Sequence, residues 1–126
     1  PRIGEPQLAE ITTRLVNFST SLAGSSANRI HNIGIACRNI DGMVLLPGDV
    51  FSYNQVVGRR VRSAGYRNAP VIVNGELEQG LAGGICQVSS TLYNAALLAD
   101  LGIVSRRHHS HPVRYLPAGR DATVVD

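Results

Sequence analysis

The sequence predicts an α+β domain in which a central helix, starting at Cys86, packs on a mostly antiparallel sheet. Two patterns carry this prediction. Apolar residues recur at helical spacing after residue 28 and again after residue 85, while β-branched runs separated by Gly and Pro fill much of the remainder. With 126 residues and 44% hydrophobic content, the chain can form one core. We therefore expect a single domain over residues 1–126, with residues 1–20 as a lead-in of undefined structure.

The segment from residue 28 to residue 40 is predicted to be a helix. Serines at positions 25 and 26 and Asn28 suit its start, and Asp41-Gly42 suits its end. The apolar stripe places Cys37 among buried residues, so its thiol is expected to be inert. The members of the stripe are Ile30, Ile33, Cys37 and Ile40.

Short extended segments are predicted around the two helices. The clearest is a hairpin, because residues 69–73 and 76–78 flank Asn74-Gly75, a pair that supplies both positive-φ positions of a tight turn. The other predicted strands cover residues 43–46, 50–53, 103–116 and 122–125.

Cys86 follows two glycines and lies in the first turn of the second predicted helix. Unpaired backbone N–H groups and the positive end of the helix dipole meet there, and both stabilise a thiolate. The same N–H groups can hold an oxyanion that forms on an attacked carbonyl. Gly83 and Gly84 leave the sulfur open to a substrate, and Gln87 and Ser89 keep the helix start polar. The pattern favours a nucleophilic cysteine, with a structural cysteine at a tight Gly-Gly entry as the alternative.

A nucleophilic cysteine needs a base, and the chain has four histidines. On an extended segment, His109 and His111 point to one side and His108 to the other. Asp121, immediately before the last predicted strand, suits the acid that orients the imidazole, and Asp126 is the second candidate. The order Cys, His, Asp is shared by papain-like and transglutaminase-like folds, which we take as an analogy for the topology.

Other chemistries have weaker support in the sequence. His109 and His111 could supply two imidazoles to Zn²⁺, but HExxH and a second paired-ligand motif are absent, so we expect no metal and no cofactor. GxSxG and Walker A motifs are also absent. A net charge of +3 with two Phe, four Tyr and no Trp offers few rings for stacking bases, so nucleic-acid binding is not expected. No apolar run approaches the roughly 20 residues of a membrane span and no signal peptide is found, so this domain itself is not expected to contact a membrane.

Five runs of the sequence are distinctive. They are NRIHNI from Asn28, LLPGDVFSYNQVVG, NAPVIVNGEL, GGICQVSSTLYNAALLADLGIV and HSHPVRYLPAGRDATV. On these runs the chain resembles the VanW family over about residues 20–126. The resemblance describes a full VanW-like domain with a trimmed C-terminal edge.

The resemblance implies a function in the cell wall. Some members of the family are implicated as L,D-transpeptidases, which cross-link peptidoglycan stem peptides through a cysteine. Carried over, that cysteine is Cys86 in GGICQ, and the histidine of the His-Ser-x-Pro-Val run is His109. His111 stands where the family usually has an apolar residue, so it is not the expected base. Ala82 stands where members often have a third glycine, which slightly restricts the loop.

We therefore predict a peptidoglycan-acting cysteine acyltransferase, of L,D-transpeptidase or L,D-carboxypeptidase type. The catalytic roles fall to Cys86, His109 and Asp121. Arg120 is expected to orient Asp121 or to bind a substrate carboxylate, with a structural salt bridge as the alternative. The predicted substrate-binding residues are Gly83, Gly84, Gln87, Ser89, Ser110 and Arg120.

The predicted partner is the peptidoglycan stem peptide, and the predicted location is extracytoplasmic, in the bacterial cell envelope. Family members usually carry a membrane anchor and peptidoglycan-binding modules ahead of this domain. Since the chain opens at Pro1, we expect it to be a processed or excised piece of an anchored parent. The alternative is a non-catalytic cell-wall binding or scaffolding domain linked to glycopeptide resistance, in which Cys86 is a packed residue and the basic loop from Arg59 to Arg62 contacts the wall polymer.

Overall fold

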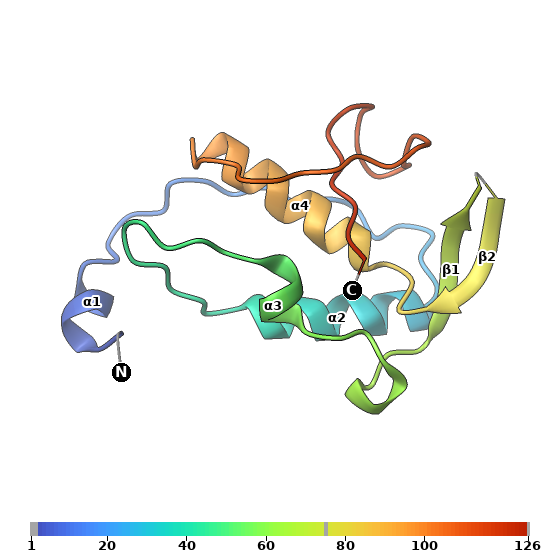
Figure 1. Ribbon diagram of the computed structural model, residues 1–126, viewed down its shortest axis with the longest axis horizontal. Helices are drawn as coiled ribbons and strands as arrows, with labels where there is room; N and C mark the ends of the chain where they lie inside the picture. Colours follow the sequence, from blue (N-terminus) through green and yellow to red (C-terminus); the bar gives the residue numbers. More distant parts are fainter. Residues whose placement is uncertain (1–2, 75, 126) are drawn as a thin grey trace.

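The computed structural model describes residues 3–74 and 76–125, and it shows two long helices beside a two-stranded hairpin (Figure 1). Helices together with a small antiparallel sheet agree with the predicted α+β class. None of the described helices is both long and apolar enough to cross a membrane. The elements are α1 (Glu5–Ala9), α2 (Ala27–Ile40), α3 (Tyr53–Val57), the 3-10 helix η1 (Arg62–Ala64), β1 (Asn68–Val73), β2 (Glu76–Leu81) and α4 (Ile85–Leu98).

Helix α2 confirms the first predicted helix but turns a different face to the core. Ser26 caps it, and the Ser26 side chain accepts a hydrogen bond from the Arg29 backbone N–H at 3.2 Å. Its buried residues are Asn32, Ile33 and Ala36. The prediction of a buried Cys37 is wrong, since this residue is exposed.

The shift of the buried face has a polar cause. The amide of Asn32 is fully buried and donates to the backbone carbonyls of Arg67 at 2.9 Å and Gly83 at 3.0 Å. Its Oδ1 accepts from the Arg67 backbone N–H at 2.8 Å. Because these bonds satisfy a buried amide, Asn32 becomes the centre of the packed face, and Cys37 rotates outward.

Helix α4 confirms the second predicted helix and begins one residue earlier than expected, at Ile85. It packs on α2, and the two helices start at the same end of the molecule, next to the hairpin (Figure 1). The prediction that α4 packs on a sheet is therefore wrong. The hydrophobic core between these elements consists of Ile33, Ala36, Val57, Tyr66, Ala82, Ile85 and Val88.

The hairpin is confirmed as predicted. Strands β1 and β2 pair antiparallel from Asn68 opposite Leu81 to Val73 opposite Glu76. Asn74 has a φ of 50°, as a tight turn requires, and Gly75 lies outside the described residues. The hairpin forms a wall at the end of the molecule where α2 and α4 begin (Figure 1).

The larger antiparallel sheet that the sequence predicted is absent from the described part of the chain. Residues 43–46, 50–52, 103–116 and 122–125 are irregular, and α3 begins at Tyr53, the last residue of the strand expected at 50–53. The segment from residue 120 to residue 122 is held by side chains of α4 rather than by a strand ladder. Ser90 Oγ accepts from the Ala122 N–H at 2.8 Å, and Asn94 donates to the Arg120 carbonyl at 2.7 Å.

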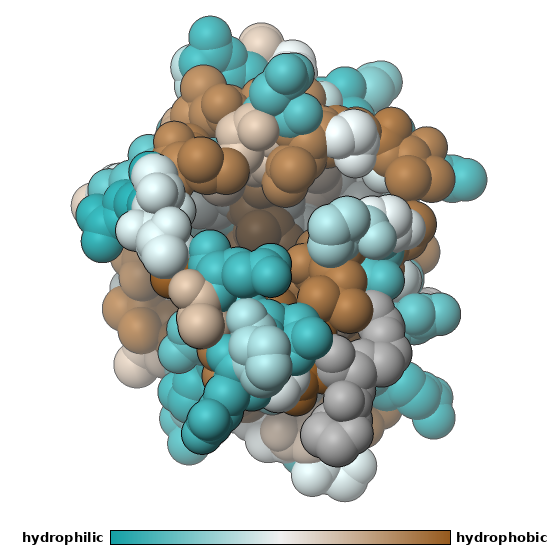
Figure 2. Space-filling view, turned by 90° about the vertical axis from the view of Figure 1, so that its left-hand side faces the viewer, coloured by the Kyte–Doolittle hydropathy of each residue, from teal (hydrophilic) through white to brown (hydrophobic). Residues whose placement is uncertain are grey.

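The lead-in, after α1, runs irregularly along the helices. Gln87 of α4 holds it, because its buried amide donates to Thr20 Oγ1 and to the Ser21 carbonyl, both at 2.9 Å. An apolar cavity of about 570 Å³ lies between the lead-in, α2 and α4, with Phe18 and Leu92 in its wall. Viewed from the α1 end, the molecule shows hydrophobic surface around a hollow (Figure 2).

Candidate active site

Cys86 lies in the first turn of α4, beside an open cavity. Gly84, immediately before the helix, has a φ of 108°, a left-handed conformation that favours glycine. The cysteine is half-buried and lines a cavity of about 1060 Å³. The walls of this cavity come from the lead-in, the hairpin, and parts of residues 109–125. A substrate can therefore reach the sulfur.

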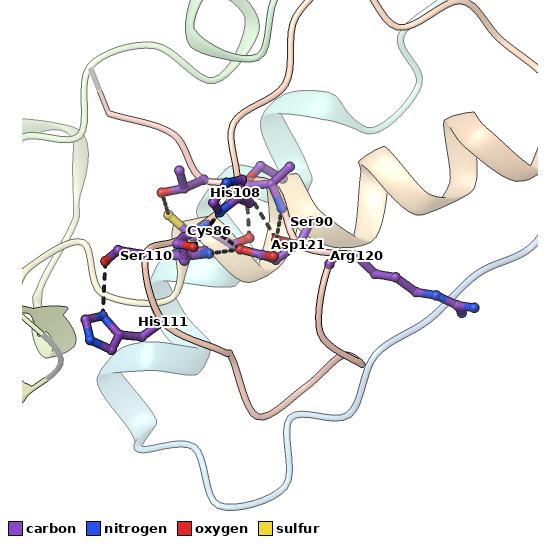
Figure 3. Close-up of polar contacts among 12 residues, drawn as sticks. Cys86, Ser90, His108, Ser110, His111, Arg120 and Asp121 are labelled. Carbon is purple, nitrogen blue, oxygen red and sulfur yellow. Dashed lines mark hydrogen bonds and ion pairs between the residues drawn. The ribbon is translucent and has the colours of Figure 1, made fainter.

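Cys86, His109 and Asp121 meet at this cavity. Asp121 Oδ2 is hydrogen-bonded to His109 Nδ1 and also accepts the His109 backbone N–H at 2.6 Å. Two bonds to one oxygen fix the imidazole relative to the carboxylate. Cys86 Sγ lies 3.4 Å from Thr123 Oγ1 and 3.6 Å from the Val124 carbonyl oxygen. Cys86 and Asp121 share one cluster in Figure 3. The alternative acid, Asp126, lies outside the described residues.

The pKa of the Cys86 thiol reflects opposing effects. Burial raises this pKa, but hydrogen bonds from His109 and Thr123 oppose burial and leave the thiol pKa below its ordinary value. The pKa of His109 is raised, first by its hydrogen bond with Cys86 and then by Asp121, against the lowering effect of burial. Burial raises the pKa of Asp121, yet the two His109 N–H donors lower it overall. These directions favour a thiolate beside an imidazolium.

The two glycines before Cys86 fit their places for packing reasons. A Cβ on Gly83 would lie 2.6 Å from the Pro70 carbonyl oxygen and 2.7 Å from that of Ala69. A Cβ on Gly84 would lie 2.9 Å from Arg29 Cγ. Both glycines let α4 start against the hairpin and α2, which aims the first turn of the helix at the cavity.

The other predicted substrate-binding residues do not all reach the cavity. Gln87 lines it, but its amide is bonded to the lead-in, and buried Ser89 donates to the Ala122 carbonyl at 2.6 Å. Ser110 is exposed and lies 3.1 Å from His111 Nδ1. The Arg120 side chain points away from the cluster (Figure 3), and the Arg120 backbone carbonyl accepts a hydrogen bond from Asn94.

The arginine next to Asp121 is Arg106 rather than the predicted Arg120. Arg106 Nη2 lies 4.0 Å from Asp121 Oδ1, and Nε donates to the Asp121 carbonyl at 2.9 Å. Its guanidinium also lies over the Tyr93 ring, 5.1 Å from the ring centre. Arg106 therefore holds Asp121 through its Oδ1 and its backbone carbonyl, whereas His109 binds Oδ2.

A model of the family described as VanW like protein matches residues 28–126. The chain belongs to the VanW family. "Uncharacterized protein YoaR" of Bacillus subtilis (strain 168) is 50% identical over 125 residues, which cover 98% of this chain and 41% of that protein. "Vancomycin B-type resistance protein VanW" of Enterococcus faecalis (strain ATCC 700802 / V583) is 29% identical over 106 residues, which cover 79% of this chain and 38% of that protein. The chain thus spans about two fifths of these relatives' length. No solved structure matches it.

The site of this VanW domain includes residues that the sequence analysis did not single out. Thr123 contacts the sulfur, and Arg29 and Tyr115 line the cavity. Burial raises the pKa of Tyr115 to about 12, so its hydroxyl stays protonated at neutral pH. The signal for them was present, because all three fall in the runs NRIHNI and HSHPVRYLPAGRDATV that carry the family resemblance.

The described residues of the VanW domain offer no metal site. Within residues 3–74 and 76–125, no three His, Cys, Asp or Glu side chains are grouped to hold an ion. His111 is exposed, and its Nδ1 faces Ser110 rather than His109. The two histidines considered for Zn²⁺ therefore have different partners, Asp121 for His109 and Ser110 for His111.

Cys86 is expected to react with an alkylating reagent at lower pH than Cys37. The thiol pKa of Cys86 is lowered, whereas partial desolvation raises the thiol pKa of Cys37. Since the thiolate is the nucleophile, Cys86 should gain reactivity below about pH 8.5 and Cys37 only above it. Timed alkylation followed by peptide mass spectrometry gives both curves from one sample. Coincident curves would show that the site does not activate Cys86.

Gly83→Ala is expected to destabilise the VanW domain by about 3 kcal/mol, because the new Cβ meets rigid β1 backbone. Gly102→Ala is the matched control, since a Cβ there has no neighbour within 4 Å. Urea unfolding of the two variants gives the difference in free energy of unfolding. Equal stabilities would mean that β1 moves freely away from the start of α4.

Proposed function

We propose that this domain is a cysteine acyltransferase that acts on the stem peptides of peptidoglycan. The observation that carries the proposal is the hydrogen-bonded His109 and Asp121 beside a half-buried Cys86 that faces a large cavity. A nucleophile, a base and an orienting acid in mutual contact are the parts that acyl transfer requires. Their order along the chain is that of papain-like and transglutaminase-like enzymes, which is an analogy in chemistry alone.

The proposed reaction has two halves. The Cys86 thiolate attacks the carbonyl carbon after the third stem residue, and the C–N bond to the terminal D-alanine breaks. The imidazolium of His109 gives its proton to the leaving amine, which departs as free D-alanine and leaves a thioester on Cys86. An amine of a neighbouring stem then attacks the thioester and loses its proton to His109, giving a cross-link and the free thiolate. Water in place of that amine gives the carboxypeptidase product.

The start of α4 supplies the stabilisation that this reaction needs. The first-turn backbone N–H groups, at Ile85 and Cys86, have no acceptor within the helix. They lie beside the sulfur, where negative charge develops on the attacked carbonyl oxygen. Gly84 adds no side chain on the approach to these groups. In this proposal the start of α4 holds the oxyanion.

The name of the enterococcal relative supports a setting in the cell wall. That protein is named for vancomycin B-type resistance. An extracytoplasmic location in the cell envelope, anchorage through a longer parent and stem peptides as partners are parts of the same proposal. They follow from the family resemblance.

The basic loop is a poor candidate for the wall-binding surface of a non-catalytic domain. Arg60 is buried, and its guanidinium donates to Asn54 Oδ1 at 2.8 Å and to the Gly58 carbonyl at 3.2 Å. Arg62 donates to Asn68 Oδ1 at 3.0 Å. Two of its arginines thus hold local structure, which leaves the cavity at Cys86 as the better-defined site.

Mass spectrometry of muropeptides tests the proposal. Incubation of the domain with purified tetrapeptide muropeptides is expected to release D-alanine and to give either a tripeptide product or a cross-linked dimer. The ratio of these products separates carboxypeptidase from transpeptidase activity. Unchanged muropeptides, together with binding of the domain to intact peptidoglycan, would favour the non-catalytic alternative.

A further inference from the structure

The cavity at Cys86 is cationic. Three arginines and two histidines line it, and within residues 3–74 and 76–125 no Asp or Glu does. They are Arg29, Arg60, Arg114, His109 and His111. Helices α2 and α4 also start at this cavity, with Ser26 and Gly84 in its wall, so both helix dipoles add positive potential. The cavity is therefore suited to an anionic ligand.

Arg29 packs against the start of α4. Its stem packs on Gly84, where an added Cβ would lie 2.9 Å from Arg29 Cγ. Its Nη1 donates to Ser25 Oγ at 2.9 Å, and its guanidinium lies 5.9 Å from the centre of the Tyr115 ring. Gly84 is two residues from Cys86, so these contacts fix a guanidinium beside the nucleophile.

This placement of Arg29 costs stability. The residue lies in the first turn of α2, where the helix dipole disfavours a cation. Burial lowers its pKa, which is the sign of a guanidinium partly removed from water. None of the ion pairs among the described residues involves Arg29. A partly buried cation without a carboxylate partner points to a ligand that brings one.

The geometry points to Arg29 as the residue that binds the free carboxylate of the peptide substrate, so that the site selects a chain end over an internal peptide bond. A guanidinium carries five N–H donors in a planar fork that matches a carboxylate, and the described side-chain hydrogen bond uses one of them. In the reaction proposed above, the leaving amino acid carries this carboxylate, and the inference rests on that function. Arg29 would position the scissile carbonyl between Cys86 and the start of α4.

Binding to two synthetic tetrapeptides tests this role separately from catalysis. The peptides are identical except that one ends in a free carboxylate and the other in an amide. Calorimetry in a Cys86→Ala background is expected to give at least about tenfold tighter binding of the free carboxylate. Adding Arg29→Gln should abolish the preference, and Arg29→Lys should keep part of it, because the charge remains without the fork. Arg38→Gln, at an exposed residue of α2 that does not line this cavity, should leave the preference in place.

Each outcome bears on the inference. Equal affinity for both peptides, binding of neither, or a preference that survives Arg29→Gln overturns it. If thermal unfolding shows that Arg29→Gln does not fold, Arg29→Lys decides, because full retention of the preference in that variant also overturns the carboxylate fork. A carboxylate preference without any turnover by wild-type protein would leave Arg29 as the anion-binding residue and remove the proposed reaction instead.

Discussion

Cys86→Ala is expected to lower the rate of D-alanine release from tetrapeptide muropeptides by at least about 10⁴-fold. The methyl group cannot form the thioester through which both halves of the proposed reaction pass. The His109–Asp121 contact should survive, because it joins His109 Nδ1 and the His109 backbone N–H to Asp121 Oδ2 and uses no atom of Cys86. Mass spectrometry of timed digests gives the rates.

Cys37→Ala is the matched control for this variant. Cys37 lies on α2, is exposed, and does not line the cavity at Cys86. Its replacement should leave the rate unchanged. Activity that persists in Cys86→Ala with native circular dichroism would remove the cysteine mechanism. Equal loss in both variants would indicate a common effect on folding.

Asp121→Asn is expected to lower kcat by about 10³- to 10⁴-fold, with a smaller change in KM. Asp121 Oδ2 accepts two N–H groups of His109, and its charge is one cause of the raised pKa of that imidazole. A neutral amide still accepts a hydrogen bond but no longer stabilises the imidazolium. The pKa of His109 should therefore fall, and the range of pH in which a thiolate and an imidazolium coexist should shrink from its alkaline side. A pH profile of kcat/KM measures this shift.

The difference in free energy of unfolding between wild type and Asp121→Asn should depend on pH, because only the wild type has a carboxyl group that titrates at this position. Because the pKa of Asp121 is lowered by folding, its contribution to stability is complete above the unfolded pKa and is lost as pH falls through the native pKa. Acidification should thus narrow the stability difference between wild type and the variant. Arg120→Gln serves as the control, since the Arg120 side chain points away from the cluster (Figure 3). In the pH profile of kcat/KM, an alkaline limb that stays at the wild-type pH in Asp121→Asn would indicate that another group orients His109.

The local parts of the site could be predicted from the sequence. Two glycines before an apolar periodic run were sufficient to place Cys86 in the first turn of a helix, since helix starts depend on neighbouring residues. Residue types and their order along the chain suggested Asp121 as the acid, whereas the family resemblance selected His109 over His111; in the structure His109 and Asp121 are hydrogen-bonded. The role of each in catalysis stays a prediction that the experiments above test.

The extended segments could not be predicted, because alternation of apolar and polar residues does not show what the backbone bonds to. Residues 122–125 were predicted to be a strand, but Ser89 and Ser90 of α4 bind the backbone of Ala122. Asn94 of α4 binds the Arg120 carbonyl just before it. The short polar side chains that replace the ladder lie more than 25 residues away in the sequence. Strand propensity is read from the segment itself and does not include such partners.

The buried face of α2 was misjudged for a related reason. Hydropathy excludes asparagine from a core, so the apolar stripe was drawn through Cys37. In the structure Asn32 is buried because two backbone carbonyls and one backbone N–H satisfy its amide. The same bonds link Arg67, just before β1, to Gly83, three residues before Cys86.

The side chains that tie residues 120–122 to α4 make Cys86 and Asp121 parts of one mechanical unit. Ser90 and Asn94 lie one and two helical turns after Cys86, so any tilt of α4 carries the acid along with the sulfur. The hairpin wall lies outside this unit and contacts it chiefly at Gly83. If the domain has the proposed activity, exchanging hairpin residues that line the cavity, such as Val71 and Leu77, should therefore change which peptides bind while Cys86 and Asp121 keep their alignment, which makes this domain a practical starting point for engineered selectivity.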